Sequence, residues 1–147
     1  MRITQESDYA LRIVTLLAAR DAVSDAKSIA DETSVTPRFA LKILHKLVQS
    51  SLVRSYKGMN GGYRLAKRPE EITVKDMIEL IDGPITICRC LMEDEVCSQS
   101  ADKRQCLFHH IFSEVSHSVS QKLARITIAD VISSEIGADE LLRRIRE

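Results

Sequence analysis

All four cysteines of the 147-residue chain fall in one stretch, ICRCLMEDEVCSQSADKRQC, at positions 88, 90, 97 and 106. Two histidines, His109 and His110, follow closely. If Cys106 opens a helix, both imidazoles lie one turn further on and either shares a face with its thiol. Thiolates and imidazoles are soft ligands for zinc or for the iron of an iron–sulfur cluster. The stretch therefore predicts a metal centre.

The cysteine spacing leaves the kind of centre open. Zinc sites usually show paired short spacings such as C-x2-C, and this chain has none. One C-x-C and two longer gaps fit a larger centre at least as well. Unrelated buried thiols are a weaker interpretation, because acidic residues such as Glu93 and Asp94 surround them. A redox pair of thiols without metal is a further alternative.

A second group of residues has the chemistry of nucleic-acid binding. Residues 1–68 carry 12 Lys and Arg against 6 Asp and Glu, whereas residues 69–147 carry 9 against 15. No acidic residue occurs between Thr33 and Pro69. Such a window makes a local positive field that suits a polyanion, although a merely solvated basic face is the alternative. Its basic residues are Arg38, Lys42, Lys46, Arg54, Lys57, Arg64, Lys67 and Arg68.

The elements predicted around this window favour DNA over the alternative. Apolar periodicity predicts helices over 8–20 and 26–33. A third helix starts after Thr36, a possible cap, with Pro37 at its first position, where the missing N–H costs nothing. Helix, turn and helix in this order can place the last helix in the major groove of double-stranded DNA.

A β-hairpin is predicted next. Leu52–Tyr56 and Tyr63–Leu65 are its strands, and KGMNGG is the turn between them. A hairpin directly after the second helix of such a pair completes a winged helix-turn-helix. We therefore expect Arg38, Lys42 and Lys46 of the helix to face DNA, together with Lys57 and Arg64 of the wing.

The second half of the chain is predicted to be helical. Thr73 and Asp76 approximate a capping box, and Gly83 with Pro84 ends that helix. An apolar stripe from Cys106 to Ile126 is too long and too thin for a compact core, so a helix of a second subunit should cover it. Two shorter helices are expected at 128–135 and 138–146, and no internal repeat is evident.

The expected fold class is mainly α with a small β-hairpin wing. We divide the chain into a winged helix-turn-helix DNA-binding domain at 1–83, a cysteine-rich cluster loop at 84–105 and a helical dimerisation region at 106–147. The longest apolar run, IVTLLAA, is too short to span a bilayer, and the acidic start argues against a secretory signal. A cytoplasmic protein without membrane contact is expected. No general base, nucleophile or cofactor loop indicates an enzyme.

Taken together, several motifs resemble the bacterial winged-helix iron–sulfur regulators, the group that contains IscR, NsrR and RirA. The resemblance covers nearly the whole chain. It implies a homodimer with crossed long helices and one cluster in each subunit. The matching segments are MRITQESDYALRIVTLLA, TPRFALKILHKLVQSSLVRSYKGMNGGYRLA with its final GGYxLA, ITVKDMIELIDGPI, TIADVI and the three cysteines Cys90, Cys97 and Cys106.

The resemblance also implies a ligand set. The three cysteines of the signature would hold the cluster, with a fourth ligand that is not a cysteine. His109 matches a histidine three residues after the third cysteine, and Asp8 matches an acidic residue early in the first helix of the other subunit. We favour His109, because His110 gives the same helix a second candidate. Cys88 is additional and could replace one cysteine. We expect [2Fe-2S] rather than [4Fe-4S], with zinc as the alternative.

By correspondence with the family, six residues should lie near an operator in double-stranded DNA: Thr36, Arg38, Phe39, Lys42, Lys57 and Asn60. Leu41 stands where some members have a Glu that reads bases, so no sequence preference carries over. The expected function is a DNA-binding transcriptional regulator, a repressor, whose cluster senses iron–sulfur status, redox state or nitric oxide. The alternative is a winged-helix repressor with a zinc or thiol-only switch at the same cysteines.

Overall fold

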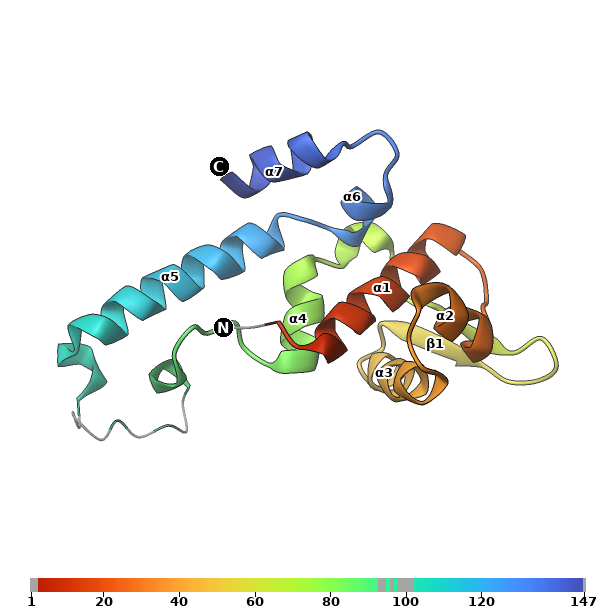
Figure 1. The fold of residues 1–147 in the computed structure, drawn as a ribbon, viewed down its shortest axis with the longest axis horizontal. Helices are drawn as coiled ribbons and strands as arrows, with labels where there is room; N and C mark the ends of the chain where they lie inside the picture. Colours follow the sequence, from red (N-terminus) through yellow and green to blue (C-terminus); the bar gives the residue numbers. More distant parts are fainter. Residues whose placement is uncertain (1–2, 93–94, 96, 98–101, 147) are drawn as a thin grey trace.

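A computed structural model describes residues 3–92, 95, 97 and 102–146 of the chain. The predicted fold class is confirmed, because the described part is mostly helical with one two-stranded antiparallel hairpin. Figure 1 shows the N-terminal helices and the hairpin gathered at one end, with the long helix α5 (Leu107–Ala124) extending away from them. None of the described helices is long and apolar enough to cross a membrane.

Helix α1 (Gln5–Arg20) begins three residues earlier than predicted. The Thr4 side chain accepts a hydrogen bond from the Ser7 N–H at 3.2 Å and so supplies the cap. Asp8 is therefore not a cap. It lies inside the helix, near the N-terminal end, where a carboxylate still complements the helix dipole.

Helices α2 (Ala26–Thr33) and α3 (Pro37–Gln49) complete the helical body and match the predictions closely. Asp25 caps α2 by accepting from the Ser28 N–H at 3.0 Å. Pro37 takes the first position of α3, as its fixed φ favours. The core between the three helices is aliphatic, as the low aromatic content predicts, and its large, wholly buried side chains include Ile13, Leu17, Ile29, Ile43, Leu44 and Leu47.

The hairpin consists of β1 (Val53–Tyr56) and β2 (Gly62–Leu65), in the register that sets Arg54 opposite Arg64. The hairpin is joined to the connection between α1 and α2 next to its turn, at the base of the protruding part of the wing. Ser24 and Tyr63 exchange backbone hydrogen bonds, at 2.9 Å and 2.8 Å. A Cβ at Gly62 would lie 2.4 Å from the Ser24 carbonyl oxygen, so only glycine permits this approach.

The helices α4 (Val74–Asp82) and α6 (Ile128–Ile132) begin in the same way. Each follows a threonine whose hydroxyl accepts from the N–H of an aspartate three residues on, while that aspartate accepts from the threonine N–H. The underlying sequences are ITVKD at 72–76 and ITIAD at 126–130. This likeness covers five residues only, which is enough to make two equivalent capped starts but is not an internal repeat of a structural unit.

The two capped starts lie side by side. The Val74 N–H donates to the Ile126 carbonyl at 2.9 Å, and the Ile128 N–H donates to the Ile72 carbonyl at 2.8 Å. Ile72 and Ile128 both belong to the buried core that α1 to α3 form. The chain after α5 therefore returns to the winged-helix body and packs into it.

Helix α6 ends at Ile132, three residues before the predicted end at 135. The Ser133 hydroxyl accepts from the Glu135 N–H at 3.2 Å, and the Ser133 backbone is extended. A serine side chain that bonds to the backbone in this way offers an alternative to the helix, which explains the early end. Short 3-10 turns occur at η1 (Pro69–Glu71), η2 (Arg89–Leu91) and η3 (Lys103–Gln105).

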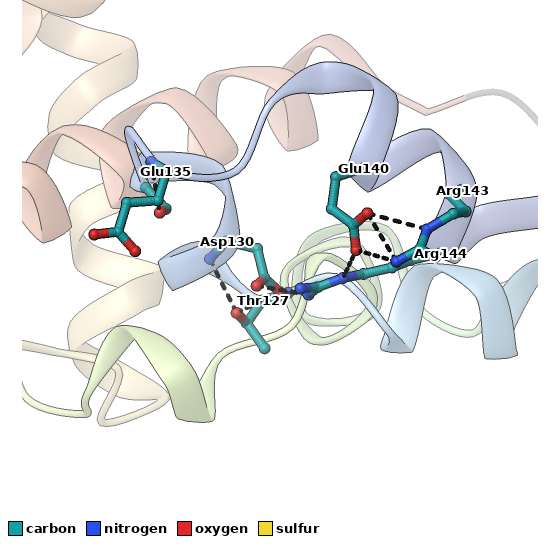
Figure 2. Close-up of polar contacts among 7 residues, drawn as sticks. Thr127, Asp130, Glu135, Glu140, Arg143 and Arg144 are labelled. Atoms are coloured by element: carbon teal, nitrogen blue, oxygen red, sulfur yellow. Dashed lines mark hydrogen bonds and ion pairs between the residues drawn. The ribbon is translucent and has the colours of Figure 1, made fainter.

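Helix α5 (Leu107–Ala124) confirms the long helical pattern, and α7 (Ala138–Arg146) has the predicted bounds. In Figure 1 the chain folds back so that α7 lies over the C-terminal part of α5. Lys122 donates to the Ile145 carbonyl and Arg125 donates to the Arg144 carbonyl, so cations satisfy the C-terminal end of α7. Figure 2 shows the third contact, a 2.8 Å ion pair between Arg144 and Asp130.

Candidate DNA interface and cysteine centre

The outward face of α3 carries the residues predicted to meet DNA. Ala40, Ile43 and Leu44 are buried against the body, whereas Arg38 and Lys42 lie on the opposite side and are exposed. Thr36 occupies the N-cap position, but its exposed side chain makes no capping hydrogen bond. Its hydroxyl is therefore not committed to holding the helix start.

Two lysines of α3 share one carboxylate of α1. Lys42 Nζ lies 2.9 Å from Glu6 Oε2, and Lys46 Nζ lies 2.6 Å from Glu6 Oε1. Hydrogen bonds from Lys46 and then Lys42 hold the pKa of Glu6 below its usual value. The arrangement fixes the angle between α1 and α3 and partly neutralises the predicted DNA-binding face. The sequence did not indicate it, because Glu6 lies 36 residues from Lys42.

Phe39 is also held from α1. Its ring meets the Tyr9 ring edge to face, with centroids 6.0 Å apart. The Lys42 ammonium lies 5.7 Å from the Phe39 centroid on the same surface. The Phe39 side chain is 40% exposed, so it presents an apolar edge beside the basic residues.

The wing consists of an exposed turn and two strands that carry basic side chains. Lys57 and Asn60, both predicted near DNA, are exposed in the turn. Arg64 lies on β2, where its guanidinium pairs with Asp21 at 2.9 Å, and this pairing raises the pKa of Arg64. Arg64 is thus directed toward the end of α1. Arg54, opposite it in the hairpin, is exposed.

His45 belongs to the same surface, although it was not among the predicted DNA-binding residues. It is exposed, and it follows Lys42 by three residues and Arg38 by seven. Residues at these spacings share one helix face. The signal was present in the sequence, since the helical period alone places His45 beside the two basic residues.

Cys88 and Cys90 are brought together by the structure, with their sulfur atoms 3.3 Å apart. Alternate residues of a fully extended segment would point to the same side, but this segment is not extended throughout. Instead Cys88 is extended and Cys90 lies in the 3-10 turn η2, where the Leu91 N–H donates to the Cys88 carbonyl at 3.2 Å. The Arg89 guanidinium between them turns outward to Glu95, at 2.7 Å.

The remaining cysteines lie within electrostatic reach of this pair. Hydrogen bonds from the Cys90 backbone and thiol lower the pKa of Cys88. The pKa of Cys90 is raised by its hydrogen bond to Cys88, then by burial, and then by the charges that Cys88, Cys106 and Cys97 would carry. Mutual repulsion of this kind is what a bound cation relieves.

At the other end of the loop, Cys106 occupies the N-cap position of α5. The His109 ring is partly buried, and its Nδ1 has no hydrogen-bond partner among the described residues. A buried ring nitrogen without a partner is costly, and ligation would satisfy it. The donor set of thiols and one imidazole therefore fits an iron–sulfur cluster, and it fits zinc as well.

The ligands are not assembled as a complete set. Among the described residues, no three Cys, His, Asp or Glu side chains are grouped closely enough to hold a metal ion. Glu93 and Asp94, the acidic residues noted beside the cysteines, lie outside the described residues. His110 follows its neighbour on α5, with the two imidazole rings 6.0 Å apart.

Asp8, the alternative fourth ligand, lies in another part of the molecule. It pairs with Arg12 at 2.6 Å on α1. In Figure 1, α1 lies in the winged-helix body. Arg89–Leu91 lies near the beginning of α5, at the end of this helix that points away from the body. Among the described residues Asp8 is not grouped with the cysteines as a metal site, and the resemblance gives the role of ligand to Asp8 of another subunit.

Helix α5 has an unusual distribution of apolar side chains. Ser116 is the only buried residue among Leu107–Ala124, all of which are described. Leu107 and Phe108 are 77% and 68% exposed, and Ile111 and Val115 continue the exposed stripe at 53% and 44%. An apolar stripe of this length on a protein surface indicates an interaction site.

Comparisons with known proteins agree with this architecture. The Rrf2 family, described as an iron-dependent transcriptional regulator, matches residues 3–134. A protein of Aquifex aeolicus assigned as an HTH-type transcriptional regulator is 34% identical over 128 residues, which are 86% of this chain and 88% of that protein. The HTH-type transcriptional regulator NsrR of Shouchella clausii is 28% identical over 146 residues, covering 97% of this chain and 96% of its own.

A solved structure gives the same result. CymR, the global cysteine regulator of B. subtilis, is similar with a TM-score of 0.71 and 26% identity over 90% of this chain and 96% of CymR. The predicted recognition as a winged-helix regulator is therefore confirmed, and so is the prediction that the chain is not an enzyme. The family match spans the helix-turn-helix, the wing, the cysteines and α5. The chain belongs to the Rrf2 family of transcriptional regulators.

Proposed function

We propose that this Rrf2-family regulator works in the cytoplasm as a homodimer that represses transcription, and that an iron–sulfur cluster controls its affinity for an operator. The ligands would be Cys90, Cys97, Cys106 and His109, with Cys88, His110 and the partner's Asp8 as alternatives. The observation that carries the proposal is the position of the cysteines, which flank the start of the same helix that later rejoins the DNA-binding body.

Binding to DNA is supported by the exposed face of α3. Arg38, Lys42 and His45 line one side of α3, and all three are exposed to solvent. Thr36 at its start and Lys57, Asn60 and Arg64 of the wing extend this surface. Phosphate contacts would supply most of the affinity, and side chains at the start of α3 would contact base edges.

A dimer is supported by the exposed stripe of α5. Isolated surface side chains need no explanation, but Leu107, Phe108, Ile111 and Val115 form a continuous series. Packing against α5 of a second copy would remove this stripe from water, and a two-fold axis would set the spacing of the two α3 helices. In this proposal 1–83 is the DNA-binding domain, 84–105 the cluster loop and 106–147 the dimerisation region, with α6 packed into the first of them.

A bound cluster would supply a centre whose charge and integrity change with iron supply, redox state or nitric oxide. The chain's own residues give such a change a route to DNA. Ile87 is hydrogen-bonded to Ser116 of α5, and the Ile126 carbonyl just beyond α5 accepts from the Val74 N–H at the start of α4. A displacement of the loop would therefore move α5 against the body that carries α3.

Iron and sulfide content and visible absorption test the cluster in protein purified without oxygen. Colour and iron should be lost in Cys90→Ala, Cys97→Ala and Cys106→Ala. Cys88→Ala should keep them if the three-cysteine set is correct. A colourless, iron-free wild type with stoichiometric zinc, or with no metal, would contradict the proposed cluster. It would not contradict the proposed binding to DNA.

The alternative function is a repressor with a zinc or thiol-only switch. The 3.3 Å approach of the Cys88 and Cys90 sulfurs specifically favours the thiol form. Selection of bound fragments from random DNA, followed by fluorescence anisotropy, would test operator binding in both cases. Arg38→Ala should weaken binding, whereas Arg143→Ala, which removes an equal charge from α7, should not.

A further inference from the structure

We infer that Cys88 and Cys90 form a redox pair, which a peroxide closes to a local disulfide when the loop carries no cluster. The inference rests on the proposed function in one respect, since Cys90 is there a cluster ligand. It goes beyond that function by giving Cys88 a role, because Cys88 is the one cysteine outside the three-cysteine set.

The geometry is the main support. The two sulfur atoms are 3.3 Å apart, whereas a disulfide requires about 2.05 Å, so side-chain rotation must bring them closer. Both cysteines are only partly buried, so a small oxidant can reach them. Cys97 and Cys106 stand further along the chain, whereas Cys88 and Cys90 are separated by Arg89 alone.

The local backbone holds the pair in this position. The Leu91 N–H donates to the Cys88 carbonyl, and the Met92 N–H donates to the Arg89 carbonyl at 3.0 Å. The Ile87 N–H ties the preceding residue to Ser116 of α5. The side chain between the two cysteines points away, because Arg89 is engaged by Glu95. The approach of the sulfurs is therefore supported by contacts within the chain itself.

The reaction balances with hydrogen peroxide as oxidant. One thiolate attacks a peroxide oxygen, the O–O bond breaks, and a sulfenic acid and one water are formed. The second thiolate attacks the sulfenic sulfur, the S–O bond breaks, and the oxygen leaves as a second water. The two thiols lose two electrons and two protons, and the peroxide is reduced to two waters. A dithiol reductant reverses the change by thiol–disulfide exchange.

The disulfide would have two consequences. It would remove Cys90 from the ligand set, so that a cluster could not be rebuilt until the pair was reduced. It would also spare Cys90 from irreversible oxidation to sulfinic and sulfonic acid, because sulfenic acid beside a second thiol condenses instead. Oxidative loss of the cluster would thus lead to a reversible state of the loop.

Peptide mapping of the full chain tests the inference. Cluster-free protein, reduced and then desalted without oxygen, is treated with hydrogen peroxide, blocked with N-ethylmaleimide and digested with trypsin. Cleavage after Arg89 separates residues 76–89, which contain Cys88, from residues 90–103, which contain Cys90. We expect the two peptides to appear joined, lighter than their sum by two hydrogens, and to separate after dithiothreitol.

Matched variants identify the pair, because residues 90–103 also contain Cys97. The joined peptides should persist in Cys97→Ser and Cys106→Ser and disappear in Cys88→Ser and Cys90→Ser. Loss of the link in Cys97→Ser, its persistence in Cys90→Ser, or its absence from the wild type would each overturn the inference. Far-UV circular dichroism establishes that every variant is folded.

Iron and sulfide analysis of the same preparations separates this inference from the proposed function. A linked pair in a protein that never takes up iron would support the redox pair and contradict the cluster. A protein that binds a cluster but gives no link after the cluster is removed would contradict the redox pair alone. If both hold, peroxide-treated apoprotein should accept iron and sulfide only after reduction, whereas Cys88→Ser should lack this requirement.

Discussion

The Ile87 backbone N–H donates to the Ser116 hydroxyl at 3.0 Å, across 29 residues of sequence. Ser116 is 5% exposed, on a helix whose other residues are half-buried or exposed. The bond thus attaches the segment that leads into Cys88 and Cys90 to the middle of α5. Motion of the cysteine pair and of α5 is coupled through this contact if the regulator works as proposed.

Ser116→Ala should loosen that attachment. The Ile87 N–H would lose its partner in a partly buried position, which typically costs about 1–3 kcal/mol. Hydrogen–deuterium exchange of the backbone over residues 85–92 should therefore speed up, and the same segment should hold iron less firmly. Ser113→Ala changes an exposed serine of the same helix and is the control. Equal exchange in the two variants would mean that the bond does not hold the segment.

Glu6→Gln should raise the affinity for DNA of random sequence. The change releases Lys42 and Lys46 from their carboxylate partner and removes one negative charge near the face of α3. The slope of log affinity against log salt should steepen, by about 0.9 for each added phosphate contact. A titration by fluorescence anisotropy measures this slope. An unchanged slope would place this part of α3 away from the phosphates.

The same substitution should alter stability in acid. Because the folded-state pKa of Glu6 lies below its usual value of 4.5, the stabilisation is complete above that pH and is lost as the pH falls through the folded-state pKa. The loss should stay below about 1 kcal/mol, since the lysines are partly exposed. Urea unfolding between pH 6 and pH 3 should show this acid-dependent component in the wild type and not in Glu6→Gln.

Gly62→Ala should disturb the base of the wing. The added Cβ would meet the Ser24 carbonyl oxygen at 2.4 Å and the Asp25 nitrogen at 3.0 Å, both of which are backbone atoms that cannot turn away. Overpacking of this kind usually costs about 1–3 kcal/mol. Thermal unfolding and DNA affinity should both suffer. Gly137→Ala, where a Cβ meets nothing within 4 Å, should leave both unchanged.

Asp130→Ala should destabilise the chain more than Asp76→Ala, although the two aspartates occupy equivalent positions of the two capped starts. Asp130 also receives Arg144 of α7, as Figure 2 shows. Burial alone would raise the pKa of Asp130, but hydrogen bonds from Thr127 and Arg144 hold it below its usual value, so its contribution is lost as the pH falls. Hydrogen–deuterium exchange over residues 138–146 should increase only in Asp130→Ala.

Ile111→Glu should abolish dimer formation if the apolar stripe of α5 is the interface. A carboxylate at the centre of that stripe would have to be desolvated in the assembly. Sedimentation or light scattering should report a monomer, whereas Glu114→Gln, on an exposed position of the same helix, should remain a dimer. A dimeric Ile111→Glu would assign the interface to another surface.

The start of a helix could be predicted wherever a single residue type determines the backbone conformation at that point. Pro37 fixed the start of α3, and the Thr73–Asp76 pair fixed the start of α4. The stop of α6 was missed, because Ser133 ends the helix through a side-chain bond that competes with it. The pairing of the two capped starts was not predicted for a different reason, since the contact between Thr73 and Thr127 is visible only in the folded chain.

The residue types of the candidate site could be predicted from the sequence, but the contacts between these residues could not. The cysteines, the histidines and the basic window are visible in the sequence. The pairing of Glu6 with Lys42 and of Arg64 with Asp21 is not, because it depends on how α1 crosses α3 and the hairpin. The roles assigned to Cys97, Cys106, His109 and Asp8 stay predictions, as does the division into three regions.

The wing is clamped where its turn leaves the body, and the turn itself presents its side chains to solvent. Ser24 and Tyr63 join backbones at this point, and Gly62 leaves no space for a side chain there. Lys57 to Asn60, in contrast, are exposed, and Met59 contacts solvent on all sides. Gly58 is the exception within the turn, because its φ of 105° favours glycine. If the turn contacts an operator as proposed, substitutions at Lys57, Met59 and Asn60 would alter that contact without a compensating change in the body.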